Sequence, residues 1–326
     1  MDALLTSYDS NVETPPFRAA ILESGEISYP PAPFSASNDA SWVALTAALN
    51  CSATGSNLTC VRNAPATTIK NIIDTQSLVF APVVDNVTLV ASPAGARAAN
   101  KFARVPVLGG TNSQEGRVFE FGSSNVTALL EQFFRLDAPQ IIPSVAAAYP
   151  VGTVVGVNTG YDVASQIFTD YYFQCPQALW ANETAAQGVP TWRYYFNASF
   201  PNTQSFPNAG VFHSSEIQLV FQTYSGGPVL PLTAGPTGIL PTNIPPTAQE
   251  FALSSFMNGA WAQFMREPRV GPGWNALGTF NESLGVLGND GGAGVTVIDQ
   301  NVVDSKCSLF FPAYRAISGN VYGLGQ

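Results

Sequence analysis

Two residues of this sequence have side chains suited to proton transfer and stand in loops shortly after apolar segments. His213, in "AGVFHSSEIQLVF", is the only histidine among 326 residues, and Glu115 ends the stretch "VPVLGGTNSQE". An imidazole can take a proton from a serine hydroxyl, and a carboxylate that accepts the other imidazole N–H fixes the tautomer and stabilises the imidazolium. The pair is therefore a candidate for two parts of a nucleophilic hydrolase site. The alternative is that His213 is a structural side chain.

The elements that must position this pair alternate between strand and helix patterns. Short apolar runs that end in turns predict strands within residues 17–25, 105–116 and 191–200. Apolar residues at helix spacing predict helices over residues 126–136 and 248–267. The alternation indicates an α/β fold with a mostly parallel sheet flanked by helices.

Glu115 and His213 are expected at the same edge of that sheet. In open α/β sheets, ligands bind beyond the carboxyl ends of the strands, and both residues follow candidate strands. The Pro-rich, apolar stretch over residues 225–247 lies close behind His213 in the chain. It is interpreted as an ordered loop near a site rather than a flexible tether.

The composition excludes several classes of partner. The net charge is −9, only three lysines occur and no basic cluster is present. These features argue against nucleic acid or an anionic membrane as a binding partner. No stretch is predicted to span a membrane. Charged residues make up only 11% of the chain, and seven N-x-S/T sequons indicate a glycosylated, secreted protein. The sequon asparagines are Asn50, Asn57, Asn86, Asn125, Asn182, Asn197 and Asn281.

The four cysteines favour disulfides over a metal site. Cys51 and Cys60 bound a short loop, while Cys175 and Cys307 lie far apart; no C-x-x-C occurs, and one histidine does not complete a usual zinc set. From spacing alone, three pairings remain open. No metal or organic cofactor is expected.

Five separated motifs carry a family resemblance. "FRAAILESG", "FAPVVDN", "VPVLGGTNSQEGRVF", "GVFHSSEIQLVF" and "DSKCSLF" occur in this order along nearly the whole chain. They resemble successive signatures of the type-B carboxylesterase/lipase family, which includes the cholinesterases and secreted fungal lipases. The order in the chain agrees with the acid-before-histidine order of α/β-hydrolases. The resemblance implies a single α/β-hydrolase domain, of which residues 1–326 form the C-terminal part.

The resemblance also assigns roles. It implies that Glu115 is the triad acid and His213 the general base, that Ser24 orients the acid, and that Glu216 is a buried acidic residue beside the histidine. For Ser24 and Glu216 a purely structural role as turn or cap groups remains an equal alternative. The family's pairing implies the disulfides Cys51–Cys60 and Cys175–Cys307.

One element of the family pattern is absent from these residues. The nucleophile of the family lies in a G-x-S-x-G elbow, and no such pattern occurs here. By the resemblance, the serine would lie a few residues before Met1, and the oxyanion loop and the first half of the sheet would also precede it. The N-terminus does not read as a secretory signal, which agrees with that expectation.

The sequence thus predicts a secreted serine ester hydrolase, represented by a portion that holds the acid and the base but not the nucleophile. Such a chain is expected to be inactive alone. Its partners would be a small-molecule or lipid ester and the N-terminal half of its own domain. The rival interpretation is a non-catalytic binding or adhesion protein on the same fold, and a third is an α/β domain without this chemistry. Acyl and alcohol preference, and esterase against lipase activity, are left open.

Overall fold

The computed structural model describes the chain except residues 27, 30–37, 52–56, 153–156, 225–243 and 318–326. Most of the Pro-rich stretch, predicted as an ordered loop, therefore lies outside the described residues. The chain divides into two compact units, one formed by residues 1–31 with 92–326 and the other by residues 32–91. None of the described helices is both long and apolar enough to cross a membrane.

The larger unit contains a five-stranded sheet in the order β1-β2-β3-β4-β5. The first four strands are parallel and β5 is antiparallel to β4. The three predicted strands are all present, as the first three of the sheet, and the hairpin formed by β4 and β5 was not predicted. The strands are β1 (Ala20–Glu23), β2 (Val107–Asn112), β3 (Thr191–Phe196), β4 (Glu282–Leu287) and β5 (Val295–Asp299).

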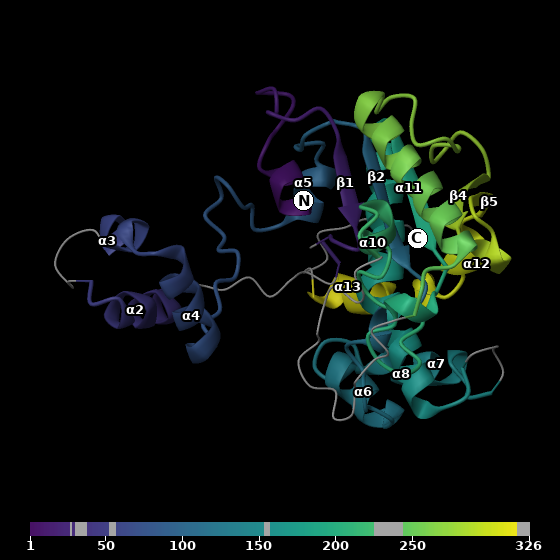
Figure 1. Ribbon diagram of the computed structural model, residues 1–326, viewed down its shortest axis with the longest axis horizontal. Coiled ribbons are helices and arrows are strands. Elements are labelled where there is room, and N and C mark those ends of the chain that lie inside the picture. The colour runs from purple at the N-terminus through teal and green to yellow at the C-terminus, as the bar shows by residue number, and fades with distance from the viewer. Residues whose placement is uncertain (27, 30–37, 52–56, 153–156, 225–243, 318–326) are drawn as a thin grey trace. The chain divides into compact units, whose positions relative to one another are not determined.

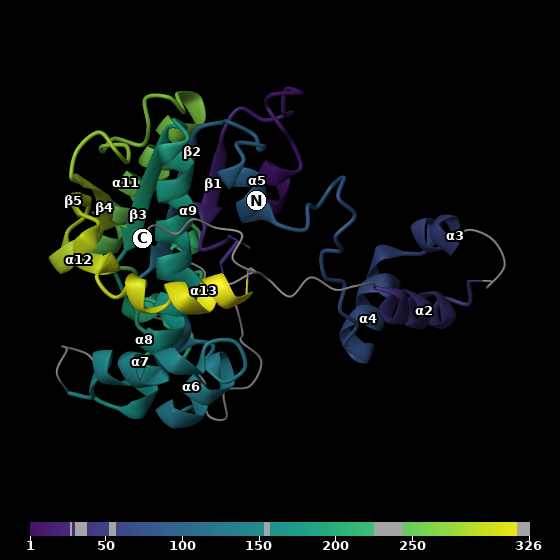
Figure 2. The ribbon, with the colours of Figure 1, turned by 180° about the vertical axis from the view of Figure 1, so that it is seen from behind.

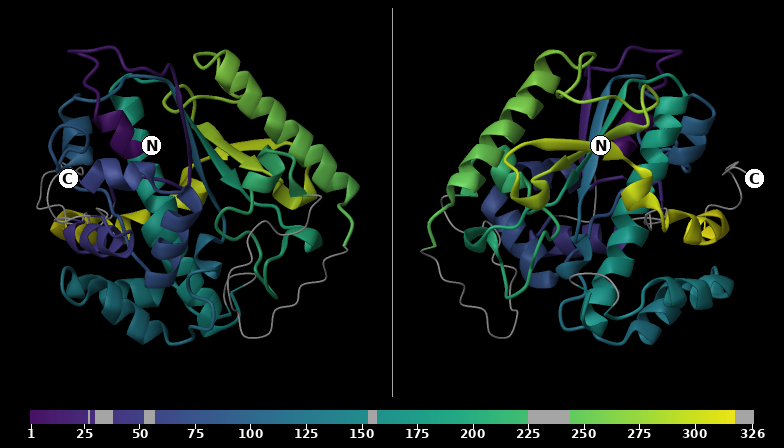
Figure 3. Two further views of the ribbon diagram at one scale, coloured as in Figure 1. Left: turned by 60° about the vertical axis from the view of Figure 1, so that its left-hand side comes forward. Right: turned by 90° about the vertical axis from the view of Figure 1, so that its right-hand side faces the viewer.

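Helices cover both faces of the sheet, as the near-continuous burial of β2 and β3 requires. On one face, aromatic residues of β3 pack with Leu253, Met257 and Phe264 of α11 (Ala248–Arg266). On the other, Val107 packs with Trp180 of α9 (Cys175–Ala186). The helix α11 lies in front of the sheet in Figure 1, and α9 lies in front of it in the reverse view of Figure 2. Figure 3 (right) shows α11 and α9 on opposite sides of the sheet. Side chains alternate between the faces of a strand, so each face has its own core.

Further helices of the larger unit lie beyond the carboxyl ends of the strands (Figure 1). The helices α6 (Val126–Phe134), α7 (Ile142–Ala148) and α8 (Gly160–Thr169) build a further apolar core there around Phe134, Ile167 and Tyr171. The helix α8 runs through one π-helical turn, Asp170–Gln174, into α9. The remaining helices of this unit are α1 (Asp2–Thr6), α5 (Pro93–Ala98), α10 (Ile217–Val220), α12 (Asn301–Asp304) and α13 (Phe311–Ile317).

Each unit contains one disulfide, and the two pairs are those that the resemblance implies. Cys175 and Cys307, 132 positions apart, join α9 to the C-terminal segment with a Cα separation of 5.1 Å. Chain-entropy models assign such a large loop about 4–5 kcal/mol of stabilisation. In the smaller unit, Cys51 and Cys60 have a Cα separation of 5.9 Å. Its helices are α2 (Asp39–Ala48), α3 (Asn57–Asn63) and α4 (Ala66–Gln76).

Candidate active site

The two predicted site residues lie beyond the carboxyl ends of the strands and contact each other. Glu115 begins a single 3-10 turn after β2, and His213 lies in the loop between β3 and α10. Two hydrogen bonds join the two loops: the Gln114 N–H donates to the Val211 carbonyl at 3.1 Å, and the Val211 N–H donates to the Gln114 side-chain oxygen at 2.9 Å. The parallel register that places Asn112 opposite Phe196 brings both strand ends to one edge.

The Glu115 carboxylate is held from three directions. It is 0% exposed, and its Oε2 lies 2.7 Å from Nδ1 of His213. Its Oε1 accepts hydrogen bonds from the Asn112 N–H, at 2.6 Å, and from the Ser24 hydroxyl. With both oxygens occupied, the carboxylate cannot rotate freely. A proton on Nδ1 then faces Oε2, which leaves Nε2 of His213 as the ring nitrogen able to accept a proton.

Ser24 reaches Glu115 from a backbone conformation that is unusual for serine. It follows β1 directly and has a φ of 53°, in the left-handed region, which costs a residue with a Cβ about 1 kcal/mol or more. Its N–H donates to the Gly110 carbonyl at 2.9 Å, which fixes this turn against β2. The turn points the hydroxyl at the carboxylate. The structure thus places Ser24 against the acid, where the resemblance puts an orienting serine.

Asn112 connects Glu115 to the second carboxyl group, Glu216. Its amide nitrogen donates to Glu216 Oε2 and to the Phe212 carbonyl at 2.9 Å, while its backbone N–H binds Glu115. Glu216 is 1% exposed. Burial, and then the negative charge of Glu115, raise the pKa of Glu216 to about 8. Burial of Tyr194, and then the negative charge of Glu216, raise the pKa of the Tyr194 phenol.

The Glu216→Gln variant is expected to become more stable than the wild type as the pH rises, because the wild type loses stability while the variant does not. Between its ordinary pKa of 4.5 and about 8, Glu216 keeps a proton in the folded protein that the unfolded chain has released. Folding therefore binds a proton in this window, and wild-type stability falls as the pH rises through it. Glutamine stays neutral and can still accept from Asn112. Thermal melting should give similar midpoints at about pH 5 and a midpoint roughly 5 °C higher for the variant at about pH 8.

A matched control for this measurement is Glu282→Gln, because Glu282 is an exposed carboxylate at the start of β4. The control should follow the wild type at both pH values. A Glu216→Gln midpoint that differs from the wild type by the same amount at about pH 5 and pH 8 would show that Glu216 does not titrate in this window.

Aromatic rings surround the imidazole of His213. The ring centroids of Phe119 and Phe173 lie 5.3 and 4.9 Å from that of His213. Phe119 also stacks on Phe168 at 4.9 Å, and Phe173 comes from the π-helical turn. The His213 side chain is 29% exposed, so it opens to solvent beside an apolar wall. These rings were not predicted as site residues, since nothing in their local sequence distinguishes them from core aromatics.

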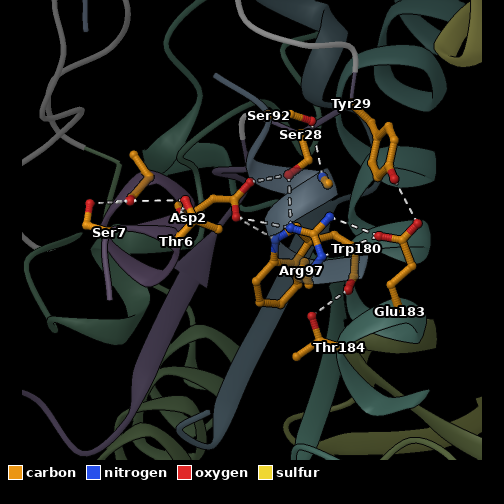
Figure 4. Close-up of polar contacts among 12 residues, drawn as sticks. Asp2, Thr6, Ser7, Ser28, Tyr29, Ser92, Arg97, Trp180, Glu183 and Thr184 are labelled. Carbon is orange, nitrogen blue, oxygen red and sulfur yellow. Dashed lines mark hydrogen bonds and ion pairs between the residues drawn. The ribbon is translucent and has the colours of Figure 1, made fainter. Parts of the chain in front are cut away.

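A second buried polar cluster, also not predicted from the sequence, ties α1 to α5 and α9 (Figure 4). Arg97, 1% exposed, forms ion pairs with Asp2 at 3.3 Å and with Glu183 at 2.9 Å. Its guanidinium lies over the Trp180 ring, and the Trp180 indole N–H donates to Asp2 at 2.8 Å. Because every charge in the cluster has a partner, it serves to hold α1 in place.

The other sequence-predicted sites are the seven sequon asparagines. Asn57 is half-buried, whereas the other six sequon asparagines are exposed: Asn50, Asn86, Asn125, Asn182, Asn197 and Asn281. In the part of the chain that the structure describes, no group of three or more His, Cys, Asp or Glu side chains could hold a metal ion.

Comparisons with known proteins show what this chain is similar to. The chain is 26% identical over 234 residues to Secreted lipase 1 of Botryotinia fuckeliana, covering 63% of this chain and 40% of that protein. It is 24% identical over 236 residues to Secreted lipase 5 of Gibberella zeae, covering 67% of this chain and 36% of that protein. It is also 24% identical over 227 residues to a chlorogenic acid esterase of Aspergillus niger, covering 68% of this chain and 35% of that protein. The chain thus spans well under half the length of these curated relatives.

The fold has a counterpart among solved structures. PNB esterase superposes with a TM-score of 0.60 and 20% sequence identity, over 94% of this chain and 60% of that one. This likeness confirms the predicted fold class, an α/β-hydrolase portion with a mostly parallel sheet flanked by helices. The profile described as the carboxylesterase family matches residues 2–283, well over half of the chain. This chain belongs to the carboxylesterase family.

Proposed function

We propose that this chain supplies the acid and the base of a serine-dependent carboxylic-ester hydrolase. The observation that carries the proposal is the 2.7 Å contact between Glu115 Oε2 and His213 Nδ1, with the carboxylate buried and its other oxygen held by Ser24 and Asn112. This is the arrangement that orients an imidazole for general base catalysis. Family membership and the names of the relatives, two lipases and an esterase, support ester bonds as the substrate class.

In the proposed reaction, Nε2 of His213 takes the proton of a serine hydroxyl as that oxygen attacks the ester carbonyl. Glu115 stabilises the imidazolium that forms. The imidazolium then gives its proton to the departing alcohol, which leaves an acyl-serine. Water, activated by the same Nε2, attacks the acyl group and releases the acid and the free serine. The 326 residues contain no G-x-S-x-G, so we propose that the attacking serine and its oxyanion donors come from outside these residues.

The aromatic rings beside His213 favour a substrate that has an apolar group next to the reacting carbonyl. Phe119, 48% exposed, and Phe173 both contact the imidazole. An acyl or alcohol group with apolar surface would cover these rings and exclude water from the proton transfer. We propose that the substrate is a small-molecule or lipid ester with such a group on one side of the ester bond.

We further propose that the protein acts outside the cell as a glycoprotein. Two of the similar proteins are named secreted lipases, and the two disulfides fit an oxidising compartment. The exposed sequon asparagines, such as Asn86 and Asn281, are accessible for glycan attachment. Attached glycans would also compensate for the low charge content of the chain.

The test compares two proteins on p-nitrophenyl acetate. One contains residues 1–326 alone, and the other extends the reading frame upstream of the Met1 codon through a G-x-S-x-G elbow. The 326-residue chain should give no more turnover than an unrelated control protein, because loss of one oxyanion donor alone costs roughly 100- to 1,000-fold and loss of the nucleophile costs more. The extended protein should hydrolyse the ester.

Two results would contradict the proposal. Robust turnover by residues 1–326 that His213→Ala abolishes would identify a serine of this chain as the nucleophile. An extended, folded protein without turnover on any ester would instead favour a binding protein on the same fold.

A further inference from the structure

A large cleft borders the two loops that carry Glu115 and His213. Its volume is about 1010 Å³, and its walls come from the Glu115 loop, the start of α8 and the loop that follows β3. We name it the Arg117 cleft after the most buried charged residue in its lining. The lining residues used below are Gln114, Arg117, Phe121, Tyr161, Asp162 and Gln204.

The Arg117 cleft carries no net charge. Among its described lining residues, only Arg117 and Asp162 are charged, and they form an ion pair of 2.9 Å with side-chain exposures of 10% and 11%. The Arg117 guanidinium also lies over the Tyr161 ring, and the Tyr161 hydroxyl donates to the Arg117 carbonyl at 2.6 Å. Because both charges are already compensated, an ionic ligand would have to break this pair. The cleft therefore favours a neutral ligand.

The remaining lining combines ring faces with hydroxyl and amide groups. Phe121 is 43% exposed, and its ring centroid lies 6.4 Å from that of Tyr161 in an edge-to-face arrangement. Serine, threonine and asparagine side chains also line the walls, together with two prolines, while the Gln204 amide is already hydrogen-bonded to the backbone of Gly210. Aromatic faces are electron-rich and attract the weakly positive C–H groups of a saturated ring, while amides and hydroxyls pair with its hydroxyl groups. A hydrocarbon would leave those polar groups unpaired.

We propose that the Arg117 cleft binds a neutral, hydroxyl-rich ring, a glycosyl or cyclic polyol group of the ester substrate. The inference rests on the proposed function, because it places the cleft beside the acid and base of that function. Gln114 immediately precedes Glu115 and accepts from the Val211 N–H at 2.9 Å, two residues before His213. A ring in the cleft would therefore lie next to the loops that hold the proposed acid and base.

The test is binding to residues 1–326, measured by saturation-transfer NMR and calorimetry with methyl β-D-glucopyranoside as the probe. We expect saturable binding with a dissociation constant of about 1–10 mM, the range for one small, weakly held ring. Phe121→Ala should weaken it at least about tenfold. A second variant, Ser199→Trp, should fill the cleft from an exposed position and also abolish binding. The matched control is Phe221→Ala, since Phe221 is 64% exposed and lies outside the cleft.

Thermal melting of each variant verifies folding. No saturable binding by the wild type would overturn the inference, as would equal binding by Phe121→Ala and Phe221→Ala. Tighter binding of D-glucuronate or of 1-hexanol than of the neutral glycoside would also overturn it, because the first is charged and the second lacks the ring hydroxyls. The readout needs no ester turnover, so its failure is distinguishable from failure of the proposed function, which the turnover assay tests separately.

Discussion

His213→Ala is expected to lower kcat/KM for p-nitrophenyl acetate by about 10⁴- to 10⁶-fold in the elbow-extended protein. The chain contains no other histidine to replace it, and His213 is the side chain held by the buried Glu115. Removing the imidazole removes both the base for the attack and the acid for the departing alcohol. The fold should be retained, because the imidazole is 29% exposed and contacts rings that also pack on one another.

Added imidazole provides the control for this variant. The space left between Phe119 and Phe173 opens to solvent, so free imidazole should enter it and restore part of the turnover. A merely structural histidine would not show such rescue. Loss of less than about tenfold in kcat/KM, in a variant that melts like the wild type, would contradict the assignment of His213 as the base.

Glu115→Gln is expected to lower kcat by about 10³- to 10⁴-fold while leaving the fold intact. The amide oxygen can accept from Ser24 and Asn112 as Oε1 of the carboxylate does, which directs the NH₂ group at His213 Nδ1. That nitrogen must then accept rather than donate. The imidazole proton moves to Nε2, the atom that has to receive the serine proton, so the base is blocked by its own tautomer.

Glu131→Gln is the matched control for this experiment, because Glu131 is an exposed carboxylate on α6. Steady-state kinetics on the same ester should leave the control unchanged. If both glutamine variants retained wild-type kcat, Glu115 would have only a structural role in joining the loops after β2 and β3.

The parallel strands of the fold were predictable, and the antiparallel hairpin was not. The strands β2 and β3 are almost entirely buried, β1 alternates between buried and half-buried residues, and all three lie in compact apolar runs that end in turns. In β4, Gly285 interrupts the apolar run, and a Cβ there would clash with Trp274, a contact that only the fold reveals. The strand β5 is largely half-buried, and its apolar and polar residues do not alternate regularly along the strand. Neither therefore stands out from a loop in the sequence alone.

The contact between Glu115 and His213 was predictable, but its surroundings were not. Glu115 and His213 belong to sequence motifs of the family. Both follow strands, and the carboxyl ends of parallel strands meet at one edge of the sheet. The hydrogen bonds of Asn112 to Phe212 and Glu216 span 100 and 104 positions, and the aromatic wall depends on the π-helical turn that carries Phe173. Such contacts arise from tertiary packing, which local residue patterns do not encode.

The most direct test of the acid–base pair is the tautomer of His213, observed by ¹⁵N NMR of residues 1–326 labelled at histidine. Because the chain contains one histidine, the spectrum contains one imidazole and needs no assignment. In its neutral form, the ring is expected to carry its proton on Nδ1, bound to Glu115, and to leave Nε2 unprotonated. Glu115→Gln should move the proton to Nε2. A wild-type spectrum with the proton on Nε2, or one that Glu115→Gln leaves unchanged, would contradict the account.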